Sequence, residues 1–262
     1  MSVTSPPAEV DAGIEALSDD LACASLGLAR RFAAGGTMWC ASPAWPFHAH
    51  HVAVEFVHPV IVGKRALAAV TVPPGADVVA TLRASVRPGD MVVALARADD
   101  AEVADAMARG RAWGVETLWL GHGARPPAGA ADHVVWLETD DDLAASEQFV
   151  RLYHMLWELT HVCFEHPGLL KPSEEACTQE ASAAGSGSVA SAAGSGSTVC
   201  ITCSDEGRLA EVVSIDNDQA VVRTADGVER IDTMLIDPPR PNDLVLVHAG
   251  SAITNLSTAA LS

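Results

Sequence analysis

Two cysteines and one histidine in the C-terminal quarter of the sequence have side chains suited to binding a transition metal. Cys200 and Cys203 form a Cys-x-x-Cys pair, and His248 lies in the motif Val-His-Ala-Gly-Ser-Ala-Ile. A thiolate is a soft ligand that suits low-valent iron, imidazole also suits iron, and the Cys-x-x-Cys spacing favours the thiolate at neutral pH. Three plainer interpretations stay open: half of a zinc site that lacks a second Cys-x-x-Cys pair, ordinary strand cysteines, and a histidine satisfied in the core.

A second group of candidate ligands lies in a histidine-rich segment near residue 50. His51, Glu55 and His58 are spaced at i, i+4 and i+7, which places them on one face of a helix, with His48 nearby. Two imidazoles and a carboxylate on one face could bind ferrous iron. The alternative is a polar crevice lining, or a hydrogen-bond network between subunits.

The segment that carries the first group is typical of a small all-β barrel. Short apolar runs are broken by Asn217-Asp218 and by Asp226-Gly227, pairs that accept the positive φ of tight hairpin turns. The run 237–243 contains three prolines, so it cannot be a central strand and should lead to a last strand over 244–248. The sequence therefore predicts a barrel bounded by the cysteine pair and the histidine.

These residues also carry a family resemblance. The order Cys-Ile-Thr, a hairpin-rich middle and then Asp-Leu-Val-Leu-Val-His-Ala-Gly-Ser-Ala-Ile is similar to the HypC/HupF family of nickel–iron hydrogenase maturation chaperones. It covers about residues 199–256 and implies an OB-like barrel, with the family cysteine at Cys200 and the family histidine at His248. The family begins Met-Cys, whereas here Val199 precedes the cysteine.

The resemblance implies a specific task for the barrel. It would receive an iron with cyanide and carbon monoxide ligands, the Fe(CN)2CO unit, from a HypD-type scaffold protein. It would then deliver that iron to the hydrogenase large-subunit precursor. Cys200 would bind the iron, His248 would support it and Cys203 would assist; no permanent cofactor is expected.

The first 170 residues alternate between strand-like and helix-like segments. Strands are expected over 37–41, 66–72, 90–96, 115–121 and 133–138, and helices over 9–33, 47–57, after Asp99, and over 142–164. Such alternation predicts an α/β fold, a doubly wound five-stranded parallel sheet with helices on both faces. The last helix is apolar on more than one face, so we expect a homodimer or tetramer.

This region resembles sugar isomerase (SIS) domains of the phosphoheptose isomerase kind over roughly residues 9–168. The resemblance rests on the order of the strands and helices, on the segment Ala53-Val-Glu-Phe56, and on a His-x-Leu-x-Glu-Leu motif in the final helix that begins at His154. It implies that Glu55 occupies the position of a catalytic glutamate. We therefore treat Glu55, His51, His58 and His154 as a possible ligand site of the SIS-like domain.

The loops after the strands argue against sugar-phosphate turnover. A phosphate site needs small residues with free N–H groups at a helix N-terminus. The loop 42–47 instead contains two prolines and two bulky rings, and the loop 97–100 contains two aspartates. We expect a maturation chaperone that is not an isomerase. The alternative is a phosphosugar isomerase or a sugar-phosphate sensor with the barrel as a regulatory appendage.

Composition limits the partners and the location. The net charge of −18 with only two lysines disfavours binding to nucleic acid or to anionic membranes. With neither a secretory signal nor a membrane-spanning run, we expect a cytoplasmic protein.

Residues 171–199 are predicted to be a flexible linker between domain 1–170 and domain 200–262. The sequence Ser-Ala-Ala-Gly-Ser-Gly-Ser occurs in it twice, and no residues in it could form a core. We expect the barrel to swing on this linker. Cys177, within it, has no evident role.

Overall fold

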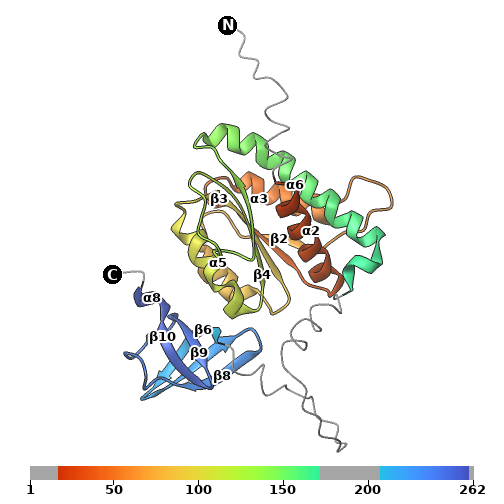
Figure 1. The fold of residues 1–262 in the computed structure, drawn as a ribbon. Coiled ribbons are helices and arrows are strands. Elements are labelled where there is room, and N and C mark those ends of the chain that lie inside the picture. Colours follow the sequence, from red (N-terminus) through yellow and green to blue (C-terminus); the bar gives the residue numbers. More distant parts are fainter. Residues whose placement is uncertain (1–16, 172–206, 260–262) are drawn as a thin grey trace, which may run out of the picture.

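The computed structural model describes residues 17–171 and 207–259. The N-terminal region contains helices α2 (Ser18–Ala33), α3 (Pro46–Val57), α4 (Val78–Ser85), α5 (Ala101–Trp113) and α6 (Asp142–Glu165), with a 3-10 turn η1 (Pro167–Leu170). Its strands are β1 (Met38–Ala41), β2 (Ala69–Thr71), β3 (Met91–Arg97), β4 (Glu116–His122) and β5 (His133–Leu137). They form one parallel sheet in the order β2-β1-β3-β4-β5, which confirms the predicted α/β fold. Figure 1 shows this region as a ribbon.

Helices cover both faces of this sheet. One apolar cluster joins the sheet to α2, α3 and α6, and a second joins its other face to α4 and α5. The central strand β3 is therefore a continuous apolar run, with every residue from Met91 to Ala96 buried. Helix α6 packs against both α2 and α3, so one subunit already covers much of the apolar surface that suggested an oligomer.

Three of the described helices begin at aspartate caps. The side chains of Asp77, Asp100 and Asp141 each accept a hydrogen bond from a backbone N–H in the first turn of α4, α5 and α6, respectively. Helix α4 was not predicted, because its eight residues are too few to show a clear apolar period. Near the start of α5, the Glu102 carboxylate accepts a hydrogen bond from the Val78 N–H and so ties α5 to α4.

The C-terminal region is a closed barrel in the order β10-β8-β7-β6-β9. Its elements are β6 (Arg208–Asp216), β7 (Gln219–Thr224), β8 (Gly227–Asp232), β9 (Leu244–His248), β10 (Ser251–Asn255) and a short helix α8 (Leu256–Ala259). The predicted hairpins are confirmed, with Asn217 at φ 53° and Gly227 at φ 130°. The expected last strand is β9, but β10 follows it after a turn in which Ala249 and Gly250 both have positive φ.

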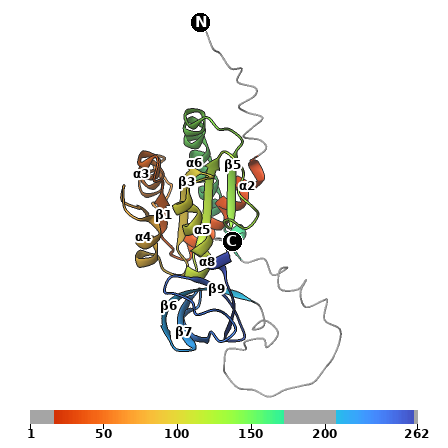
Figure 2. The ribbon, with the colours of Figure 1, turned by 90° about the vertical axis from the view of Figure 1, so that its left-hand side faces the viewer.

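The barrel lies against helices α4 and α5 of the N-terminal region, as Figure 2 shows. The central contact is Glu211 on β6, which accepts hydrogen bonds from Arg83 on α4 and from Arg109 and Trp113 on α5. This arrangement corrects our expectation of a barrel that swings on its linker. The predicted linker itself lies outside the described residues.

Candidate functional site

The predicted iron site is only partly within the described residues. Cys200 and Cys203 lie outside them, whereas His248 is the last residue of β9 and is half-buried. The exposed residues Ala249 and Gly250 turn the chain so that Ser251 of β10 pairs with His248. On its other side β9 pairs with β6, where Arg208 is opposite Val247. His248 is therefore held at a barrel end, beside a tight turn.

The structure brings three of the four SIS-domain candidates together at the surface where α3 meets α6. Glu55 Oε1 lies 3.2 Å from His51 Nε2 and 3.5 Å from His154 Nε2. His51 and Glu55 are four residues apart on α3, so they share a face, and His154 reaches them from α6. The predicted His51–Glu55 pairing on one helix face is thus present, with His154 completing a three-residue cluster.

This cluster has the chemistry of a metal site. One ligand atom from each of His51, Glu55 and His154 lies within 4.8 Å of the other two. Two imidazole nitrogens and one carboxylate oxygen suit a divalent transition metal, and they leave coordination positions for other ligands. Glu55 is partly shielded, with 18% of its side chain exposed, and the two histidines are at 43%.

Tyr153 contacts the cluster through His51. It was not predicted from the sequence to be a site residue. Its hydroxyl oxygen lies 2.7 Å from His51 Nδ1. If Nδ1 donates its hydrogen to this oxygen, the Nε2 lone pair is free to bind a metal ion beside Glu55, as in many metal-binding histidines. Burial and the charge of Glu55 raise the pKa of Tyr153 to about 12, so the phenol keeps its proton at neutral pH. In the sequence Tyr153 is indistinguishable from an apolar position of α6.

His58 lies outside this cluster because α3 ends before it. Val57 is the last helical residue, and His58 has φ −124° and ψ 69°. It is exposed and, with His50, lines a separate shallow hollow between α3 and β2. The i+7 spacing therefore does not bring it to Glu55.

The carboxyl ends of β3 and β4, in the region where ligands bind in such sheets, are lined by aromatic rings and paired charges. The Trp45 ring lies 5.5 Å from the His122 ring and 6.0 Å from the Phe149 ring. Beside them the Arg97 guanidinium bonds Asp142 at 2.6 Å and Asp99 at 3.2 Å. Rings and paired charges thus occupy the region in which a phosphate would need free N–H donors.

His48 is buried behind this region and is held neutral. Its Nε2 lies 2.9 Å from Ser146 Oγ, and its ring contacts those of Phe149 and Tyr153. Burial and the neighbouring His51 lower the pKa of His48 to about 4. It therefore contributes a polar side chain but no charge at neutral pH.

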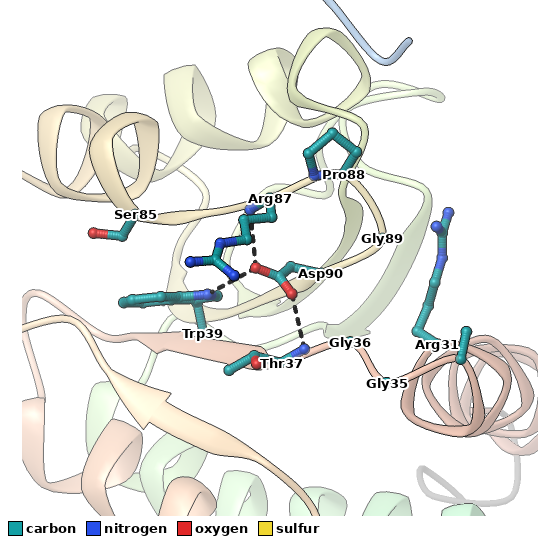
Figure 3. A pocket seen from close by; sticks show the side chains of 11 residues that line it. Arg31, Gly35, Gly36, Thr37, Trp39, Ser85, Arg87, Pro88, Gly89 and Asp90 are labelled. Atoms are coloured by element: carbon teal, nitrogen blue, oxygen red, sulfur yellow. Dashed lines mark hydrogen bonds between the residues drawn. The ribbon is translucent and has the colours of Figure 1, made fainter. Parts of the chain in front are cut away.

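One hollow at the opposite end of the sheet is a structural junction. It has a volume of about 470 Å³ and lies between the ends of α2 and α4. Figure 3 shows Asp90 at its floor, where the carboxylate accepts hydrogen bonds from the N–H groups of Thr37 and Arg87 and from the Trp39 indole. The carboxylate thereby links the starts of β1 and β3. This end of the sheet is opposite to the carboxyl ends of the strands, where ligands usually bind.

The C-terminal region matches a known protein family. Residues 209–262 match the HupF/HypC family. The match contains His248 and its motif, and it suggests a hydrogenase maturation chaperone that interacts with hydrogenase maturation factors. The predicted resemblance is thus confirmed from residue 209 onward, whereas Cys200 and Cys203 precede the matched residues. A search of curated protein sequences found no match.

The N-terminal region matches solved structures of SIS type. A phosphoheptose isomerase from Francisella tularensis is 11% identical, covering 59% of this chain and 95% of that chain with a TM-score of 0.49. The phosphoheptose isomerase GmhA from Neisseria gonorrhoeae is 16% identical, covering 58% and 93% with a TM-score of 0.48. The sugar isomerase domain of an RpiR transcription factor from Sphaerobacter thermophilus is 19% identical, covering 69% and 100% with a TM-score of 0.42.

Among the described residues, no helix is long and apolar enough to cross a membrane.

Proposed function

We propose that this protein is a nickel–iron hydrogenase maturation chaperone whose barrel carries the Fe(CN)2CO iron unit. It would take the iron from a HypD-type scaffold and deliver it to the hydrogenase large-subunit precursor. The observation that carries the proposal is the HupF/HypC family match over residues 209–262, which contains the His248 motif. The iron unit is cargo in this proposal and not a resident cofactor.

The position of His248 supports this role. It is half-buried, and the adjoining Ala249-Gly250 turn is exposed. Cys203 lies five residues before Arg208 in the sequence, and Cys200 lies eight residues before it. In the sequence, the cysteine pair therefore comes shortly before Arg208, whose partner on β9 is Val247, the neighbour of His248.

Each residue has a distinct part in the proposal. The Cys200 thiolate binds the iron, because a soft anionic ligand suits low-valent iron. The His248 imidazole adds a second ligand or orients the bound unit. Cys203 assists by favouring the thiolate of its neighbour.

The N-terminal domain is proposed to bind clients or a second copy without turning over a sugar phosphate. The filled loops around Trp45 and Arg97 support the lack of turnover. Exposed apolar side chains support the contact with another chain: Phe47 and Val54 on α3 are 59% and 53% exposed, and Val62 in the following loop is fully exposed. Because α6 is largely covered within one subunit, these residues are the better basis for an oligomer.

Infrared spectroscopy of the protein purified anaerobically with its scaffold partner tests the iron proposal. We expect cyanide and carbonyl stretching bands that vanish in Cys200→Ala, weaken in His248→Ala, and persist in the matched control Cys177→Ala. Hydrogenase maturation in cells should follow the same order, with Cys203→Ala giving a partial loss. Normal maturation in the Cys200→Ala strain would exclude iron transport through this residue.

A second candidate function is favoured by the cluster of His51, Glu55 and His154. A metal held there could support a phosphosugar isomerase or a sugar-phosphate sensor, with the barrel as a regulatory part. The test is turnover of sedoheptulose 7-phosphate by metal-loaded protein. Turnover that disappears in Glu55→Gln would establish this second function, and its absence would leave the cluster as a binding site only.

A further inference from the structure

The barrel is fastened to the N-terminal domain by one buried carboxylate. The side chain of Glu211 on β6 is only 3% exposed. Its Oε1 accepts from Arg83 Nε at 2.9 Å, and from a second Arg83 nitrogen and from Arg109, each at 2.7 Å. Its Oε2 accepts from Trp113 Nε1 at 3.0 Å. One barrel side chain thus engages both α4 and α5.

Backbone contacts surround this carboxylate and fix the orientation of the barrel. Arg109 also donates to the Asn242 carbonyl at 2.7 Å, and Arg223 of β7 donates to the Arg83 carbonyl at 2.8 Å. At the end of α5, a Cβ atom on Gly114 would lie 3.1 Å from the Ala225 carbonyl oxygen. The hydrogen bonds join several points on each domain, so the barrel cannot rotate without breaking some of them.

The surroundings of Glu211 favour its ionised form. Burial alone would raise the pKa of Glu211, but the hydrogen bonds from Arg83 and Trp113 and the charges of Arg83 and Arg109 lower it overall. The carboxylate is therefore ionised in the docked state. Removing it would leave two arginines facing each other without their shared acid, which is much more costly than losing an exposed ion pair.

The same strands connect this contact to the candidate cargo site. Glu211 is paired with Leu244 of β9, and His248 lies four residues further along that strand. At the rise of a β-strand this corresponds to about 13 Å. A barrel fixed at Glu211 therefore also has the His248 turn fixed relative to α5.

We propose that Glu211 is a positioning residue for iron transfer. By fastening the barrel to α4 and α5, it holds the His248 end in one orientation beside the N-terminal domain, and the partner protein meets both domains as a single surface. This inference rests on the proposed function, because it assumes that the His248 end exchanges the iron.

Docking itself is tested on the full-length protein, without any hydrogenase. We expect Glu211→Ala to increase the radius of gyration in small-angle scattering and to accelerate amide exchange in α5 and β7 by about tenfold or more. Glu211→Gln should be intermediate, since its amide oxygen can accept from the arginines while its NH2 group opposes the Trp113 N–H. The matched control is Glu229→Ala, which removes a partly exposed barrel glutamate paired with Arg208.

Arg83→Ala gives an independent variant, because it breaks the contact from the N-terminal side and leaves the barrel sequence intact. It should reproduce the scattering and exchange changes of Glu211→Ala. Unchanged scattering and exchange in both variants would overturn the assignment of Glu211 as the docking residue.

The functional part is tested by maturation in cells. We expect Glu211→Ala and Arg83→Ala to reduce maturation about tenfold, because a pre-organised surface is lost, and the infrared bands of purified protein to persist because Cys200 is intact. Undocked variants that mature hydrogenase normally, or better than the wild type, would overturn the positioning role. If instead Cys200→Ala matures normally, the proposed function itself fails, and this inference fails with it.

Discussion

Two glutamates of this protein show how differently a carboxylate can be surrounded. Glu211 is 3% exposed and accepts four short hydrogen bonds from two arginines and a tryptophan. Glu55 is 18% exposed and lies 3.2 and 3.5 Å from two imidazole nitrogens. Both oxygens of Glu211 are satisfied by protein donors, whereas Glu55 has two longer contacts, to imidazoles that could bind a metal ion together with it. The comparison separates a residue that joins domains from one suited to bind a ligand.

The largest expected effect is on the coupling of the two domains. Glu211→Ala should destabilise the docked form by about 3–5 kcal/mol, because the arginines lose a buried partner. Calorimetry should then show separate transitions for the barrel and the N-terminal domain in place of a joint one. Glu229→Ala should leave the wild-type profile. A single unchanged transition in Glu211→Ala would show that the carboxylate does not couple the domains.

The next effect concerns His48, which lies between the filled strand ends and the Glu55 cluster. An unfolded histidine binds its proton near pH 6.5, whereas the pKa of His48 in the folded protein is lowered to about 4. The unfolded state therefore binds more protons between these values. The stability that His48 contributes is full above pH 6.5 and is lost as the pH falls toward 4.

This loss should amount to about 3 kcal/mol. Urea unfolding at pH 7 and at pH 4.5 measures it as the difference between wild type and His48→Gln, which keeps a polar side chain toward Ser146. The variant should show a weaker fall in stability over this interval, and His50→Gln should behave as wild type. Equal pH dependence in all three proteins would contradict a buried, neutral His48.

Metal binding at Glu55 should stabilise the protein by a smaller amount. A divalent transition metal such as Mn²⁺ or Zn²⁺ at about a hundred times its dissociation constant should add about 2.7 kcal/mol. Thermal unfolding should show the stabilisation in wild type and in His50→Ala, but not in Glu55→Gln or His154→Ala. His50 is a suitable control because it adjoins His51 but bonds the Pro46 carbonyl. Stabilisation that survives in Glu55→Gln would place the metal elsewhere.

The sequence predicted local features of both regions more completely than long-range ones. The hairpins at Asn217 and Gly227 were recognisable because their turn residues tolerate positive φ. Strand β10 was missed because its turn places Ala249 at φ 48°, which no residue preference marks. His51 and Glu55 were paired from their spacing on one helix, whereas His154 was added only through the family resemblance.

The docking contact was beyond sequence reasoning for a different reason. Glu211 meets Arg83, Arg109 and Trp113 across separations of 128, 102 and 98 residues. In the sequence, each of these charged residues could equally be an exposed surface charge, and Trp113 could equally be a ring of the core. Only the packing of the barrel on α4 and α5 brings them together, and the Ser/Gly-rich linker instead indicated independence.

The smallest expected effect comes from Tyr153, and it separates a metal site from a plain hydrogen-bond network. Tyr153→Phe keeps the ring between α3 and α6 but removes the hydroxyl that contacts His51 Nδ1 at 2.7 Å. Loss of one such hydrogen bond should lower the stability of the metal-free protein by about 1 kcal/mol. If His51 is a metal ligand oriented by this hydroxyl, metal affinity should also fall by about tenfold, because outer partners fix the tautomer and ring direction. Isothermal titration of metal into wild type and Tyr153→Phe measures the second quantity, and urea unfolding without metal measures the first. Equal metal affinity in both proteins would leave Tyr153 as a packing residue with no part in orienting His51.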